Sequence, residues 1–140
     1  MKQLATTLVA LALVDVAFAQ ALALRCDGDL GLYENGFGKP TAQQKSTRIV
    51  TIDRKAGLAT MDTLFGERSA ALVEDSGGRR YTFIVKHNRQ FGDKLIATEA
   101  VNLNRYTGEL SSVYYFDPPE PDGTFYVAFR GICQMAAPKF

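Results

Sequence analysis

The single histidine of the chain, His87, is the first candidate for acid–base chemistry, because histidine gains and loses a proton near neutral pH. It lies between Lys86 and Asn88 on a predicted strand. No Gly-x-Ser-x-Gly motif and no assigned acidic partner accompany it, so the parts of a nucleophilic site are missing. The pattern favours an ordinary residue near the end of a strand over a catalytic base. We therefore expect no catalytic residues and no enzyme activity.

Metal-ligating and phosphate-binding residues form no recognisable motif in this sequence. No cysteine or second histidine stands at ligand spacing from His87. Asp117, Glu120 and Asp122 could chelate calcium, but a solvated turn stiffened by prolines explains this cluster more simply. No glycine-rich phosphate loop precedes a predicted helix. The sequence thus predicts neither a metal ion nor a cofactor.

Aromatic residues are concentrated in two segments near the C-terminus, Tyr114–Phe116 and Phe125–Phe129, on either side of a proline-rich loop. Because side chains alternate between the two faces of a strand, Tyr114 and Tyr115 cannot both face the core. Outward tyrosines often contact proteins or sugars, so the candidate binding residues are Tyr114, Tyr115 and Tyr126. Core packing is the alternative, since a chain without tryptophan needs phenylalanine and tyrosine to fill its interior.

The two cysteines, Cys26 and Cys133, are expected to form one disulfide bond in an oxidising compartment. Strand alternation places Cys26 on the same face as Leu24, and Cys133 on the same face as Phe129 and Gly131. Both thiols should then point inward, and Gly131 leaves room for a close approach. Bridged Cα atoms lie about 4.4 to 6.8 Å apart, so the bond requires the first and last strands to be neighbours.

The first 19 residues have the pattern of a secretory signal peptide. A positive residue precedes a mostly apolar run, and Ala17-Phe18-Ala19 is a small-x-small cleavage site before Gln20. A membrane anchor would need about 20 apolar residues and would bury Asp15 at a cost. We expect cleavage, a mature domain of residues 20–140 in the periplasm or outside the cell, and no stable insertion into a membrane.

The formal net charge of the chain is +1, and the signal segment carries one lysine and one aspartate. The mature chain therefore has little surplus positive charge, and a nucleic acid or an anionic membrane has no electrostatic support as a partner. Basic residues do crowd the stretch from Arg79 to Lys94, opposed only by Asp93. Solvated strand faces and loops explain this stretch more simply than a binding patch.

Short apolar runs separated by turn signals predict an all-β domain. Strands are expected at 22–32, 47–53, 58–64, 69–74, 81–88, 94–103, 109–116 and 124–133, with the longest loop over 33–46. About eight antiparallel strands in sequence order indicate a single meander. A disulfide between its first and last strands would make it a closed or nearly closed barrel. A two-sheet β-sandwich is the alternative.

Two segments of the chain repeat the same pattern. Asp53-Arg54-Lys55-Ala56-Gly57 and Asn104-Arg105-Tyr106-Thr107-Gly108 each follow an alternating apolar strand. The Asp or Asn can bond to backbone N–H groups two residues on, and the glycine can take a left-handed conformation. We predict two tight hairpin turns, with paired Asp/Asn-Arg sites as the functional alternative.

The chain resembles a group of small exported bacterial proteins of unknown function through Cys26-Asp27-Gly28, Leu103-Asn104-Arg105-Tyr106-Thr107-Gly108 and Gly131-Ile132-Cys133. The resemblance covers nearly all of the mature chain and implies a disulfide-tied β domain without catalytic residues. A weaker likeness is to periplasmic lysozyme inhibitors of the C-type class, which also begin with Cys-x-Gly, end near a cysteine and form small antiparallel barrels. The middle of this chain departs from these inhibitors, so no inhibitory residue is carried over.

These observations predict a non-catalytic binding module of the cell envelope, whose partner is an unknown protein or small ligand. Inhibition of a lysozyme-like or other hydrolase is one alternative. A structural or stress-related role in the envelope is another.

Overall fold

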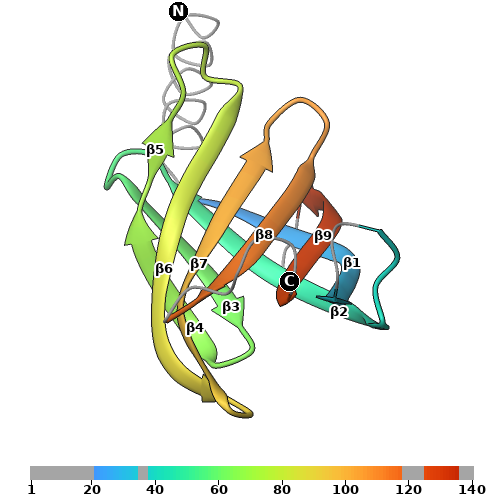
Figure 1. Cartoon of the computed structure of the whole chain (residues 1–140). Coiled ribbons are helices and arrows are strands. Elements are labelled where there is room, and N and C mark those ends of the chain that lie inside the picture. Colours follow the sequence, from blue (N-terminus) through green and yellow to red (C-terminus); the bar gives the residue numbers. More distant parts are fainter. Residues whose placement is uncertain (1–20, 35–37, 118–124, 136–140) are drawn as a thin grey trace, which may run out of the picture.

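The computed structural model describes residues 21–34, 38–117 and 125–135. Every regular element among them is a β-strand, and the strands form one antiparallel sheet (Figure 1). The predicted all-β meander barrel is confirmed. The strands are β1 (Leu22–Glu34), β2 (Ala42–Asp53), β3 (Leu58–Thr63), β4 (Gly66–Ala71), β5 (Val73–Glu74), β6 (Arg80–Phe91), β7 (Lys94–Asn104), β8 (Glu109–Phe116) and β9 (Phe125–Met135).

The two ends of the chain join the sheet rather than leave it open. The strand order is β4-β3-β2-β1-β9-β8-β7-β6-β5, so β1 and β9 pair in its middle. Cys26 lies directly opposite Cys133 in this pair, and the predicted disulfide bond links them. The neighbouring positions are Gly28 and Gly131, where an added Cβ would collide with the backbone of the facing strand. Glycine is therefore required for β1 and β9 to approach this closely.

The free edges of the sheet lie in the middle of the sequence. Cα atoms of β4 and β6 come within 8 Å of each other, but no described backbone ladder joins these two strands. The barrel is consequently nearly closed. The predicted strand at 69–74 is in fact two strands, because the chain changes partner at Leu72: β4 pairs with β3, and β5 pairs with β6. This crossing bridges the gap at one rim of the barrel.

The β1–β2 ladder is longer than the sequence pattern predicted. Its pairs continue to Leu32 opposite Ala42, so half of the loop expected at 33–46, residues 33–34 and 42–46, is strand, and residues 35–37 lie outside the described chain. Residues 42–47 are mostly exposed and polar and show no apolar alternation. Pairing with β1, and not burial, extends this strand.

Both predicted hairpin turns are present, in the β2–β3 and β7–β8 connections. The Asp53 carboxylate accepts a hydrogen bond from the Ala56 backbone N–H at 2.9 Å. Asn104 accepts two such bonds, from the N–H groups of residues 106 and 107, at 3.0 and 3.1 Å. Gly57 and Gly108 have φ of 68° and 74°, in the left-handed region. The side-chain oxygen and the glycine together stabilise each turn.

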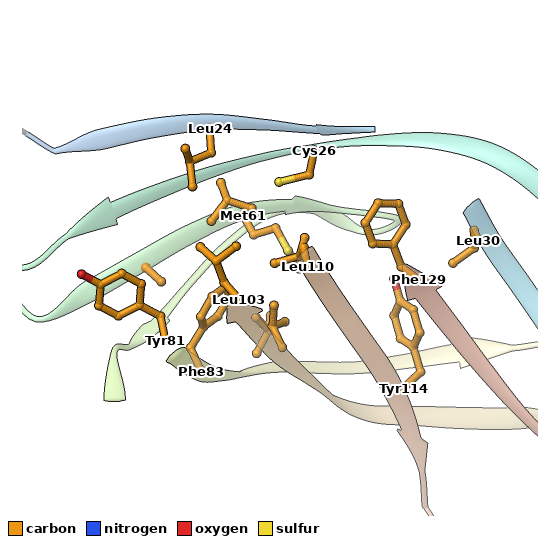
Figure 2. Close-up of a cluster of buried hydrophobic side chains, with 14 of the residues drawn as sticks. Leu24, Cys26, Leu30, Met61, Tyr81, Phe83, Leu103, Leu110, Tyr114 and Phe129 are labelled. Carbon is orange, nitrogen blue, oxygen red and sulfur yellow. The ribbon is translucent and has the colours of Figure 1, made fainter. Parts of the chain in front are cut away.

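Apolar side chains fill much of the interior (Figure 2). Leu24 and Cys26 on β1 lie across the barrel from Phe83 and Leu103. Phenylalanine and tyrosine supply the large rings in a chain that has no tryptophan. Burying one such side chain contributes about 1.5 to 3 kcal/mol. In Figure 2, Tyr114 and Phe129 lie at the end of the cluster away from Leu24 and Tyr81, and polar side chains enter the interior on that side.

Candidate functional site

Four polar side chains meet inside the barrel, each from a different strand. Arg48 comes from β2, His87 from β6, Glu99 from β7 and Tyr114 from β8, and all four are buried. Strand pairing explains part of the arrangement, because Glu99 lies directly opposite Tyr114 in the β7–β8 ladder. We refer to these four residues as the inner polar cluster.

Glu99 is the link between the histidine and the arginine of this cluster. His87 Nε2 lies 3.0 Å from Glu99 Oε1, and Arg48 Nη2 lies 4.0 Å from Glu99 Oε2. Arg48 Nη2 also donates to the Tyr114 hydroxyl at 2.7 Å, and Nη1 donates to the Asp62 carbonyl at 3.1 Å. The guanidinium and the carboxylate thus form a buried ion pair, and the pair with its hydrogen bonds connects five strands, β2, β3, β6, β7 and β8.

The electrostatics of the cluster follow from its burial. Burial away from solvent raises the pKa of the Tyr114 hydroxyl well above its usual value, and the negative charge of Glu99 raises this pKa further. The positive charge of Arg48 acts in the opposite direction and lowers it. Within the described residues, Arg48 Nε, His87 Nδ1 and Glu99 Oε2 have no hydrogen-bond partner. The ion pair is therefore held by few hydrogen bonds, and loss of either charge would leave the other buried without a partner.

The prediction that His87 is an ordinary residue near a strand end is wrong. His87 lies within β6, next to Asn88, which has φ 55°, and the β6–β7 register shifts between Lys86 and Arg89. Phe65 packs edge-on against the imidazole, with ring centroids 5.2 Å apart. The sequence did hold a signal, because His87 shares its strand face with Tyr81, Phe83 and Val85, which are all buried.

The inner polar cluster combines an imidazole with a carboxylate, but it is closed to substrates. The side chains of His87 and Glu99 are each 0% exposed, and that of Arg48 is 3% exposed. A substrate therefore cannot touch the pair in this conformation. The contacts of the cluster join strands across the barrel interior.

The structure separates the three predicted binding tyrosines. Tyr114 points into the barrel, whereas Tyr115 points outward and is 55% exposed, as strand alternation requires for adjacent residues. Tyr126 also faces outward, but Tyr33 stacks on it with ring centroids 4.8 Å apart and leaves it only 8% exposed. The loop between β8 and β9, residues 118–124, lies outside the described chain. Binding at Tyr115 and Tyr126 stays a prediction.

A shallow hollow of about 520 Å³, here called the outer groove, crosses β6, β7 and β8 beside Tyr115. Its floor is Ala100 on β7, which lies between Ile84 on β6 and Val113 on β8 in one cross-strand row. Ile84 and Tyr115 are exposed, and the short side chain between their strands leaves the depression. A second row contributes neutral polar groups from Thr82, Asn102 and Ser111.

A larger hollow of about 750 Å³ lies over β1, β2 and β9, but its charged groups already have partners. Asp29 pairs with Lys45 at 2.9 Å, and Asp27 accepts a hydrogen bond from Thr47 at 2.7 Å. These contacts lower the pKa of both carboxyl groups. A ligand in this hollow would have to compete with these bonds. A ligand in the outer groove would not.

The residues 53–57 and 104–108 that suggested paired Asp/Asn-Arg sites instead hold one hairpin in place. Arg54 pairs with Glu74 at 2.9 Å. Arg105 donates to the Gly78 carbonyl at 2.7 Å and lies over the Tyr81 ring at 4.8 Å. Both arginines therefore fasten the β5–β6 hairpin to the rim of the barrel.

Within the described residues, no three side chains of His, Cys, Asp or Glu come together as a set of metal ligands. The same part of the chain contains no helix long and apolar enough to cross a membrane. Neither the models of known protein families nor the curated protein sequences match this chain.

Proposed function

We propose that the protein is an exported, non-catalytic binding module of the cell envelope that meets its partner at the outer groove. The observation that carries this proposal is the contrast between the two faces of β8. On the inner face, the groups capable of acid–base chemistry are buried away from solvent. On the outer face, Tyr115 and Ile84 are exposed beside a hollow. Exposed aromatic side chains of this kind are common at binding surfaces.

Export is supported by the signal pattern of residues 1–19 and by the Cys26–Cys133 disulfide, since such bonds persist in oxidising compartments. We expect the exported protein to begin at Gln20. Mass spectrometry of protein recovered from the periplasm or the culture medium would measure this directly. Retention of residues 1–19 would contradict the export part of the proposal.

Affinity capture with matched variants tests the binding part. Wild-type protein, Tyr115→Ala and Tyr106→Ala are immobilised and exposed to the exported fraction of the native cell. Tyr106 is the control because it is 77% exposed on the β7–β8 turn, away from the groove. We expect a component that wild type and Tyr106→Ala retain equally and that Tyr115→Ala retains about tenfold less. Equal retention by all three proteins would refute binding at the outer groove.

The identity of the captured component separates the remaining functions. A cell-wall hydrolase that loses activity on binding would make the protein an inhibitor. If nothing depends on Tyr115 and deletion of the gene weakens the envelope, a structural role replaces the binding proposal.

A further inference from the structure

We infer that the outer groove binds an acidic glycan, a chain of sugar rings that carries carboxylate or phosphate groups. This inference rests on the proposed function and names the class of ligand. It follows from three properties of the groove: the side chains that line it, the state of the backbone beneath it and the charges at its border.

The lining combines an exposed aromatic ring with neutral hydrogen-bonding groups. Tyr115 offers a flat apolar face, against which the C–H face of a sugar ring can pack. Thr82, Asn102 and Ser111 form one row across three strands, spaced about 4.8 Å apart. Their hydroxyl and amide groups can both donate and accept hydrogen bonds, as sugar hydroxyls also do.

The groove is long enough for more than one sugar ring. Ser111 and Tyr115 are four residues apart on β8, which corresponds to about 13 Å along the strand. The apolar row of Ile84, Ala100 and Val113 lies between them. An extended chain along β8 would thus meet hydroxyl groups at one end, an apolar middle and an aromatic ring at the other end.

The backbone under the groove argues against an extended peptide. β7 pairs with both β6 and β8, and β8 pairs with both β7 and β9. The N–H and C=O groups of β7, and those of β8 up to Val113, are used within the sheet, so a peptide cannot add to these two strands as a further strand. A ligand must instead be held by side chains alone. This requirement suits a glycan, whose hydrogen-bonding groups project from its rings.

The charges at the border favour an acidic glycan over a neutral one. On β7 from Thr98 to Asn104, and on β8 from Ser111 to Tyr115, no outward side chain is charged. Arg80 and Lys86 stand on the outer face of β6, next to the groove, and neither makes an ion pair with a described residue. Acidic residues lie only beyond the two ends of the groove on β8: Glu109, which pairs with Arg130 at 3.6 Å, and Asp117 after the strand. Positive charge at the edge of a neutral hollow attracts a ligand of opposite charge.

Calorimetric titration of the mature protein tests this inference, with tetragalacturonate as the acidic probe and chitotetraose as the neutral one. We expect wild type and Tyr106→Ala to bind tetragalacturonate equally. Tyr115→Ala should weaken binding about tenfold, the scale of an aromatic contact at a binding surface. Lys86→Gln should weaken it about threefold and reduce its sensitivity to salt. Unchanged thermal midpoints would show that each variant is folded.

Three results would overturn the inference: no binding of tetragalacturonate, equal binding of chitotetraose, or equal losses in Tyr106→Ala and Tyr115→Ala. The proposed function is judged separately by affinity capture. If Tyr115 is needed to retain a protein without sugar, the binding module stands and the glycan does not. If Tyr115 affects neither the capture nor the titration, both fail.

Discussion

The two faces of β8 carry the same residue types at adjacent positions and place them in opposite environments. Tyr114 and Ser112 lie inside the barrel, whereas Tyr115 and Ser111 lie on the outer groove. Inside, the tyrosine hydroxyl accepts a hydrogen bond from Arg48. Outside, the neighbouring ring is open to solvent. Residue type alone therefore does not assign a role in this protein, and the face of the strand does.

Substitutions on the two faces of β8 should also change different properties of the protein, its stability on one face and its binding on the other. Substitutions on the inner face disturb a closed set of charges and hydrogen bonds, so they should act on the free energy of unfolding. Substitutions on the outer face touch few neighbours, so they should act on affinity.

Glu99→Gln should lower the free energy of unfolding by about 3 to 5 kcal/mol, because Arg48 is left buried without a counter-charge. Urea unfolding followed by circular dichroism would measure the change. The double variant Arg48→Met, Glu99→Gln should recover part of the lost stability, because it also removes the positive charge that Glu99→Gln leaves without a partner. Thr98→Ala, one residue away and facing outward, is the matched control and should change stability by less than about 0.5 kcal/mol. A similar loss in Thr98→Ala would break the division between the faces.

Replacing Cys26 and Cys133 together with alanine should lower the free energy of unfolding by about 2 to 5 kcal/mol. The bond joins β1 to β9, so its removal frees the two ends of the chain in the unfolded state. Denaturant unfolding of the variant against the oxidised wild type would measure the effect. Unchanged stability would show that the β1–β9 ladder holds the barrel ends together without the bond.

Tyr114→Phe should cost about 1 to 3 kcal/mol, because Arg48 loses the hydroxyl that accepts its hydrogen bond inside the barrel. The same substitution one residue along, Tyr115→Phe, should change stability by less than about 0.5 kcal/mol. Thermal and urea unfolding would measure the stability of both variants. The test is direct because each variant removes the same chemical group, one tyrosine hydroxyl. Equal costs would mean that burial does not distinguish these two tyrosines.

Alkaline pH should weaken the fold through Tyr114. Its pKa is raised in the folded state, so its contribution to stability is complete below about pH 10, the usual value, and is lost as the pH rises further. This residue alone should account for a loss of about 1.4 kcal/mol per pH unit above that point. The stability of Tyr114→Phe should therefore fall less steeply between pH 10 and 11 than that of wild type. Parallel slopes would show that the Tyr114 hydroxyl ionises equally in both states.

Several features could be predicted because they depend on local chemistry. The Asp53 and Asn104 oxygens and the glycines that follow them specify two tight turns, and each turn needs only five consecutive residues. Strand alternation placed Cys26 and Cys133 inward and required that only one of Tyr114 and Tyr115 face solvent. The expectation of a disulfide bond between these cysteines then implied that β1 and β9 are neighbours, as the structure shows.

Other features were decided only by contacts between distant strands. The inner polar cluster needs the register of β2, β6, β7 and β8 together, and a bulge beside His87 shifts one of these registers. The change of partner at Leu72, from β3 to β6, depends on pairing with strands far apart in the sequence, and Tyr126 is covered because β1 brings Tyr33 onto it. The amino-acid sequence by itself determined that adjacent side chains of a regular strand point to opposite faces, since that alternation follows from the backbone period. The tertiary structure decided which side chains meet, because pairing between strands sets the register and the register selects the neighbours.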